Sequence, residues 1–310
     1  MDLLLARAHR ILPLIHEGWV VAEVREWLSD AKQSIAVIQL ALERELLRVI
    51  ETLAECAIEA RVLKGLATGL LDYPDPSMRQ TGDVDVLVQP HDLLRSELAL
   101  KSAGYMPLAG SNAIDPRLVS GFTLLSPSGV EVDIHAALSR YHPCTASVEL
   151  FGSGERLPSG AIALSPEHRL IHAAGHLVWS PPGSRRASGL LDISRILDTR
   201  DLNMEQLAAD AYAFGVAPLV GIALRVEAQL RGRPTPLIRF GRLPVLEHLA
   251  FLGAHQRVAV EHLLALSKIA TWRQRRQYAR IFLAPGTRVI RDRGGFFRYY
   301  GKLIFRNNSR

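Results

Sequence analysis

The chain has 310 residues, of which 48% are hydrophobic and 22% are charged, which is typical of globular proteins and long enough for two or three domains. No run of 18 apolar residues occurs, so the sequence predicts no transmembrane helix. The N-terminus lacks the basic start and unbroken apolar core of a signal peptide, and Cys56 and Cys144 form neither a disulfide framework nor a CxxC pair. These features argue against a secreted or membrane-spanning protein and favour a reduced, cytoplasmic setting.

The positive charge is concentrated at the C-terminus. The chain has 37 basic and 31 acidic residues, a net charge of +6, but residues 271–310 alone hold 11 Arg or Lys against one acid. The rest of the chain holds 26 basic and 30 acidic side chains, so the body is mildly acidic. A basic tail of this kind suggests a polyanionic partner such as RNA, nucleotide phosphates or an acidic membrane surface. The alternative is that the arginines only solvate a helix face.

Aromatic side chains alternate with the arginines of this tail. Aromatics that stack on bases and guanidinium groups that pair with phosphates are how proteins hold single-stranded nucleic acid. The same pattern also suits a helix that packs its aromatics inward while its arginines extend to solvent. The sequence favours the second interpretation, which predicts burial of four side chains: Trp272, Tyr278, Phe282 and Phe297.

Residues 1–57 are predicted to be helical. Within residues 31–57, apolar side chains recur at steps of three and four, which is the spacing of an amphipathic helix of about seven turns that packs one face onto a core. These side chains are Ile35, Ile38, Leu42, Leu46, Val49, Leu53 and Ala57.

The next segments have the shorter period of strands. RVLKG (61–65) is predicted as a short buried strand ending at Gly65, and GDVDVLV (82–88) alternates between acidic and apolar positions. A helix is expected to begin near Pro90 and to end at Gly104.

Two further extended segments are predicted to form a hairpin. GFTLL (121–125) and VEVDIH (130–135) are joined by Ser-Pro-Ser-Gly, a turn sequence. In the second segment, Glu131, Asp133 and His135 share one face of the strand, opposite three apolar residues.

The remainder of the chain is predicted to be helical. GSGERLPSG (152–160) is rich in Gly, Ser and Pro and is a candidate domain boundary. We therefore expect an α+β protein in which a small mixed β-sheet core (58–150) lies between N-terminal helices (1–57) and a helical C-terminal domain with a basic tail (151–310).

The aspartates of GDVDVLV are the strongest indication of chemistry. Asp83 and Asp85 are two positions apart, so their side chains leave the same face of the strand with Cα atoms roughly 6–7 Å apart. Without a partner they would repel one another and be poorly solvated, whereas Mg²⁺ prefers such oxygen ligands and shares them with phosphates. Asp133, on a neighbouring strand, is correctly spaced to complete the metal site. The alternative is that both aspartates lie at the solvent edge of the strand.

These segments resemble the nucleotidyltransferase superfamily that has a DNA-polymerase-β-like catalytic core, and more narrowly a poorly characterised bacterial branch of it. The resemblance covers roughly residues 58–200. It depends on Lys64-Gly65, on Arg79 before GDVDVLV, on a helix ending in AGY, on VEVDIH, and on the later segments HRLIHAAGHLVW and LLDISRIL.

The resemblance implies roles for several residues. Asp83, Asp85 and Asp133 would hold Mg²⁺ or Mn²⁺, with Asp133 on the ion that activates the attacking hydroxyl. Lys64 and Arg79 would neutralise the charge of a nucleoside triphosphate, such as ATP. The implied role of Gly65 is to let the backbone approach the phosphates.

The histidines and one further acid allow more than one interpretation. His135 is expected to contact substrate or a metal-bound water because it shares the face of Asp133. His168, His172 and His176 recur every four residues, which is compatible with zinc, with substrate contact by His176, or with a hydrogen-bonding helix face, the interpretation we favour. Asp192 is expected to cap a helix or to pair with Arg195.

The implied activity is transfer of a nucleoside monophosphate from a triphosphate to a hydroxyl group, with release of pyrophosphate. The favoured acceptor is a small molecule, peptide or protein. One alternative is an RNA acceptor that docks on residues 271–310, and a second is a nucleotide-binding module without catalysis. Three correctly spaced acids argue against the second.

Overall fold

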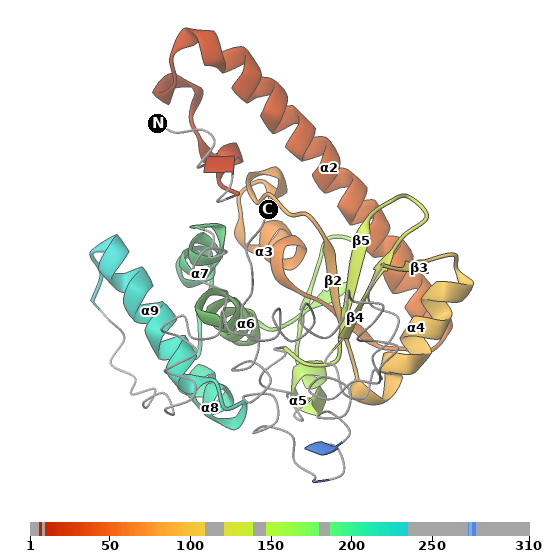
Figure 1. The fold of residues 1–310 in the computed structure, drawn as a ribbon. Coiled ribbons are helices and arrows are strands. Elements are labelled where there is room, and N and C mark those ends of the chain that lie inside the picture. The colour runs from red at the N-terminus through yellow and green to blue at the C-terminus, as the bar shows by residue number, and fades with distance from the viewer. Residues whose placement is uncertain are drawn as a thin grey trace, which may run out of the picture.

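The computed structural model describes residues 6–7, 10–108, 121–138, 147–179, 187–234, 272 and 275–276. One mixed sheet of seven strands, in the order β3-β4-β5-β2-β1-β7-β6, lies between a long N-terminal helix and a group of C-terminal helices (Figure 1). The expected α+β class, with a mixed sheet and helices at both ends, is confirmed. Within these ranges no helix is long and apolar enough to cross a membrane.

The sheet contains both parallel and antiparallel pairs. β2 runs parallel to β5 and β1 runs parallel to β7, whereas the other neighbouring strands are antiparallel. The strands are β1 (Ala60–Val62), β2 (Val84–Val88), β3 (Met106–Pro107), β4 (Gly121–Leu125), β5 (Glu131–His135), β6 (Glu155–Arg156) and β7 (Ile162–Ala163).

The helices occupy both faces of the sheet. The α-helices are α2 (Ala22–Glu55), α3 (Lys64–Asp72), α4 (Leu93–Ser102), α5 (Ser147–Gly152), α6 (Pro166–Trp179), α7 (Ala187–Thr199), α8 (Met204–Ala213) and α9 (Ala217–Arg231). Short 3₁₀ turns are η1 (Leu12–Leu14), η2 (Glu17–Trp19), η3 (Pro76–Met78) and η4 (Pro90–Asp92).

The two faces of β2 contribute to different hydrophobic cores. Val84, Val86 and Val88 pack with the apolar face of α2 and with α4. Leu87, on the opposite face, belongs to the core that α5 to α9 form. Because side chains alternate along a strand, Asp85 shares the face of Leu87 and is directed toward the C-terminal helices.

The predicted amphipathic helix is confirmed and begins earlier than expected, but Ile38 of the predicted packed face is 51% exposed and Ala57 lies beyond its last residue, Glu55. Its C-terminal half buries Leu42, Leu46, Val49 and Leu53 against the sheet. Its N-terminal half extends beyond the sheet (Figure 1), and Ala6, Leu12 and Ile15 form a small hydrophobic core with its Leu28. The hairpin β4–β5 and the helix expected between Pro90 and Gly104 are also present.

Two local predictions were wrong. The strand predicted to end at Gly65 ends at Val62, and the Lys-Gly pair instead opens helix α3, for which Leu63 is the N-cap. The Gly/Ser/Pro segment at 152–160 contributes β6 and the turn before β7, so the sheet continues past the expected boundary. Both errors arise because turn residues mark a change of direction but do not say whether the chain leaves the sheet.

A partly buried ion-pair network, in which Asp72 and Arg169 are buried, joins the sheet to the C-terminal helices. Arg169 of α6 donates to Asp72 at 2.9 Å and to Glu155 at 2.8 Å. Arg200, which follows α7, donates to the same two acids at 2.8 and 2.6 Å. Both acids are therefore shared by two arginines, and α3, α6, α7 and β6 are held together around them.

Little of the basic tail lies within the described residues. The expected burial of Trp272 is wrong, because this side chain is 75% exposed. Tyr278, Phe282 and Phe297 lie outside the described residues.

Gly65 allows the first turn of α3 to approach the segment that leads into β2. A Cβ atom at position 65 would lie 2.4 Å from Oγ1 of Thr81, a buried residue. We expect Gly65→Ala to lower the free energy of unfolding by about 1–3 kcal/mol, because the added methyl overpacks this contact. Urea unfolding would measure this, and Thr81→Ala should restore part of the loss.

Gly175→Ala in α6 is the matched control. A Cβ atom at Gly175 has no neighbour within 4 Å, and alanine favours a helix over glycine by about 1 kcal/mol. Its stability should stay constant or rise. Equal effects of the two substitutions would contradict the tight contact at Gly65.

Candidate active site

The parallel register of β2 and β5 brings two aspartates side by side. Asp85 of β2 pairs with Asp133 of β5, so both carboxylates lie on the sheet face that is turned toward the C-terminal helices. Asp85 is 1% exposed and Asp133 is partly buried. Two like charges at adjacent positions of a buried sheet require compensation by cations or hydrogen bonds.

Two side chains compensate Asp85. Its Oδ1 accepts a short hydrogen bond from Nζ of Lys64 and lies 2.8 Å from Nε2 of His135. Burial would raise the pKa of Asp85, but Lys64 and His135 outweigh burial and hold this pKa well below its ordinary value. Burial would also lower the pKa of Lys64, yet the carboxylates around it raise that pKa. The pair is therefore ionised at neutral pH.

Asp133 has a different surrounding. Its Oδ1 accepts a hydrogen bond from the hydroxyl of Thr123, which lies opposite it on β4. Ligand atoms of Asp85, Asp133 and His135 all lie within 4.8 Å of one another, which makes these residues a candidate metal site within the described part of the chain.

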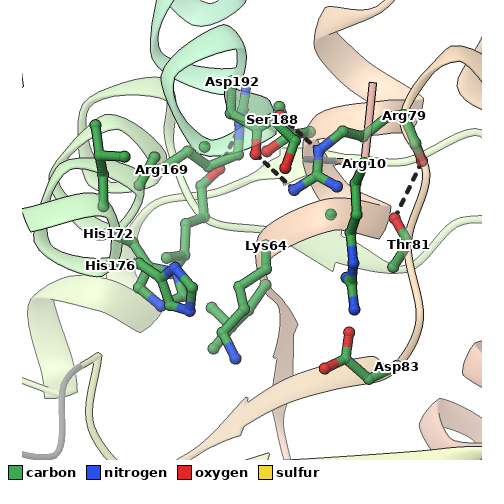
Figure 2. A pocket seen from close by; sticks show the side chains of 17 residues that line it. Arg10, Lys64, Arg79, Thr81, Asp83, Arg169, His172, His176, Ser188 and Asp192 are labelled. Carbon is green, nitrogen blue, oxygen red and sulfur yellow. Dashed lines mark hydrogen bonds and ion pairs between the residues drawn. The ribbon is translucent and has the colours of Figure 1, made fainter. Parts of the chain in front are cut away.

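Asp83 lies just outside this group. It precedes β2 by one residue and is partly buried, and Figure 2 shows the guanidinium of Arg10 directed toward its carboxylate. Burial and the nearby charge of Asp85 raise the pKa of Asp83. Of the three acids named from the sequence, the structure therefore brings Asp85 and Asp133 together and places Asp83 at the adjoining cavity.

A cavity of about 290 Å³ opens between the N-terminus of α3, the segment before β2, and helices α6 and α7 (Figure 2). Basic and hydroxyl side chains dominate its polar lining. These are Arg10, Lys64, Thr68, Arg79, Thr81, Arg169, His172, His176 and Ser188, together with Asp83 and Asp192. A cavity with this excess of cations next to paired carboxylates suits an anionic substrate that arrives with a metal ion.

Arg79 is held by an ion pair rather than directed freely into the cavity. Its Nε and Nη2 donate to the two carboxylate oxygens of Asp192 at 2.6 and 2.7 Å, and the hydroxyl of Tyr73 donates to the same carboxylate at 3.0 Å. Arg195, the partner expected for Asp192, lies instead over the ring of Tyr73. Arg79 therefore fastens α7 to the wall of the cavity.

The three histidines of α6 divide into two environments. His168 is buried, and its Nε2 lies 3.0 Å from Asp210 of α8. His172 and His176 line the cavity, and His172 is 6% exposed. Within the described ranges no metal-ligating cluster includes these residues, so the zinc interpretation gains no support.

Several lining residues were not anticipated from the sequence. Arg10 comes from the N-terminal segment, 73 positions before Asp83, and carried no local pattern. Ser188 lies in the first turn of α7, directly after the sequence PPGSRRA, and a composition rich in Gly and Ser is typical of phosphate-binding turns. This composition is the one feature of the sequence that could have indicated Ser188.

Paired strand carboxylates adjoin a basic cavity, which is the kind of site that the sequence predicted for a nucleotidyltransferase. Residues 3–232 match the model of a family described as uncharacterised nucleotidyltransferase, and the chain belongs to this family. The match includes every residue of the site described above.

One solved structure that resembles the chain is an antigenic nucleotidyltransferase-like protein from Paracoccidioides brasiliensis. It is 20% identical, with a TM-score of 0.38, and the alignment covers 65% of this chain and 88% of that one. No curated protein matches the chain significantly.

Removing Asp192 would leave the buried Arg79 without its counter-ion. We expect Asp192→Ala to cost about 3–5 kcal/mol of unfolding free energy, the range for breaking one side of a buried pair. Asp198→Ala is the matched control on the same helix, because its partners Arg231 and Arg233 are solvent-accessible and such pairs contribute about 1 kcal/mol or less. Similar losses in both variants, measured by urea unfolding, would contradict the role of the buried pair.

His172 should make stability depend on pH. Burial, and then Lys64, hold its pKa well below the ordinary value of 6.5. Below pH 6.5 the unfolded chain binds a proton at this position that the folded protein does not, so the free energy of unfolding should fall as pH decreases. His172→Gln should reduce this fall between pH 7 and pH 5 while leaving the slope above pH 7 unchanged. Identical pH profiles for both proteins would contradict burial of a neutral His172.

Proposed function

We propose that this nucleotidyltransferase-family protein transfers a nucleoside monophosphate from a nucleoside triphosphate to a hydroxyl group, with release of pyrophosphate. The observation that carries the proposal is the register of Asp85 with Asp133 beside a basic cavity. Family membership supports nucleotidyl transfer in general. The metal, the triphosphate and the acceptor are inferred from the chemistry of the site.

The carboxylates are suited to hold a divalent metal ion. Asp85 and Asp133 present oxygen atoms from adjacent strands, and Asp83 adds a third carboxylate at the edge of the cavity. A bound Mg²⁺ or Mn²⁺ would neutralise phosphate charge and lower the pKa of an attacking hydroxyl. Asp133 is partly accessible, which supports a role in orienting that hydroxyl and accepting its proton.

The triphosphate would occupy the cavity beside these carboxylates. Lys64 contacts Asp85 and lines the cavity, where it supplies a positive charge, and Gly65 lines the same cavity at the N-terminus of α3. Arg10 and Ser188 line other walls of the same cavity. Arg79, which the sequence suggested as a direct phosphate ligand, contributes through its pair with Asp192 by fixing α7 beside the phosphates.

The acceptor that we favour is a hydroxyl of a small molecule, peptide or protein in a cytoplasmic setting. The body of the chain outside the tail carries a net negative charge, which would repel a polyanionic acceptor such as RNA. An RNA acceptor is the alternative. It gains support from Trp272, which is 75% exposed in a segment rich in arginine and is therefore available to stack on a base. A non-catalytic nucleotide-binding role is the third candidate.

We expect Asp85→Asn and Asp133→Asn to abolish nucleotidyl transfer, because each removes a metal-binding charge while keeping side-chain size. Glu131→Gln is the matched control, since Glu131 is an exposed acid on the same strand, two residues from Asp133. Lys64→Ala should weaken binding of a nucleoside triphosphate with Mg²⁺ by about 1–3 kcal/mol, the range for a charge-assisted hydrogen bond.

The assay incubates the purified chain with each of four α-labelled triphosphates and cell extract, then separates RNA, protein and small-molecule fractions. Label in one fraction, lost in both aspartate variants but kept in Glu131→Gln, would identify the acceptor class. Label in RNA would favour the alternative acceptor. Nucleotide binding without any transfer would favour the non-catalytic module.

A further inference from the structure

His135 contributes a nitrogen atom to the carboxylate pair, in addition to the oxygen ligands that the sequence suggested. It lies two residues after Asp133 on β5, on the same face, and its Nε2 is 2.8 Å from Oδ1 of Asp85. Its side chain is 24% exposed, so the ring is partly accessible to solvent. The strand alternation that aligns Asp133 with Asp85 therefore also delivers the imidazole.

We propose that Asp85, Asp133 and His135 form a mixed carboxylate–imidazole site that binds Mn²⁺ in preference to Mg²⁺. This inference rests on the proposed function for the role of the site but concerns which metal ion it selects. The three ligand atoms lie within 4.8 Å of one another. A metal with bonds of about 2.1 Å spaces its ligand atoms about 3–4 Å apart, so small side-chain adjustments suffice.

The donor set is the reason for the preference. Mg²⁺ selects oxygen ligands and keeps most of its water, whereas first-row divalent ions also accept nitrogen ligands, Mn²⁺ the most weakly among them but more readily than Mg²⁺. Three carboxylates would leave the choice of metal open, but replacing one of them with His135 favours Mn²⁺. Asp83 then serves the adjoining cavity, where it lies in the structure.

Lys64 is the cation that competes with the metal ion. Its Nζ contacts Oδ1 of Asp85, the same oxygen that faces His135. A metal ion bound to that oxygen displaces the ammonium group, which lies at the wall of the cavity and is then free to contact an anionic ligand there. Lys64 therefore weakens metal binding when no nucleotide is present.

Binding of Mn²⁺ and Mg²⁺ to the full, nucleotide-free chain tests the proposal without an activity assay. Free Mn²⁺ is measured by its electron paramagnetic resonance signal, and Mg²⁺ is measured by competition against it. His135→Gln should weaken Mn²⁺ binding at least tenfold and change Mg²⁺ binding less, because glutamine keeps a hydrogen bond to Asp85 but supplies no imidazole. Lys64→Met should tighten binding of both ions. Glu131→Gln should change neither.

The spectrum of bound Mn²⁺ gives a second readout. Pulsed measurements should detect coupling to an imidazole ¹⁴N in the wild-type chain, and the coupling should be lost in His135→Gln. Absence of this coupling in the wild type would overturn the proposal, as would equal losses of Mn²⁺ and Mg²⁺ in His135→Gln. A larger loss of Mn²⁺ in Asp83→Asn than in His135→Gln would assign the site to the three carboxylates instead. A failed transfer assay leaves these binding results unaffected, so the two proposals fail separately.

Discussion

The parallel pairing of β2 with β5 is the constraint on which the site depends. It sets Asp85 beside Asp133 in a region where neither carboxylate is fully solvated. Neighbouring groups must therefore offset the desolvation and mutual repulsion of the two charges. Lys64 and His135 contact the carboxylate of Asp85, and the hydroxyl of Thr123 donates a hydrogen bond to Asp133. Because these partners come from α3, β5 and β4, any shift in strand register would separate the charges from their compensation.

The C-terminal helices complete the site through buried ion pairs. Arg169 and Arg200 share Asp72 and Glu155, and Arg79 binds both oxygens of Asp192. Buried pairs of this kind contribute little net stability, since desolvation offsets their attraction, but a misplaced partner leaves an uncompensated charge. They therefore fix where α6 and α7 lie, and so determine the shape of the cavity between those helices and the sheet.

The carboxylate pair could be predicted because its causes are local. Alternation along GDVDVLV and VEVDIH assigns Asp85, Asp133 and His135 to single faces of their strands, and both strands formed as expected. The surroundings of Arg79 could not be predicted in this way. Its partner Asp192 lies 113 residues away on a helix, and no periodicity relates the two positions.

The sequence by itself determined the long helix α2, the strands β2, β4 and β5, which face of β2 and β5 carries acids, and that those acids suit a divalent metal ion. Side-chain period and ligand chemistry are properties of short segments, so these features could be predicted locally. Only the tertiary structure decided that Lys64 opens a helix and contacts Asp85, that Arg10 approaches Asp83, and that Arg79 is held by Asp192. These contacts depend on how distant segments pack, and long flexible side chains reach partners that only a three-dimensional arrangement brings within hydrogen-bonding distance.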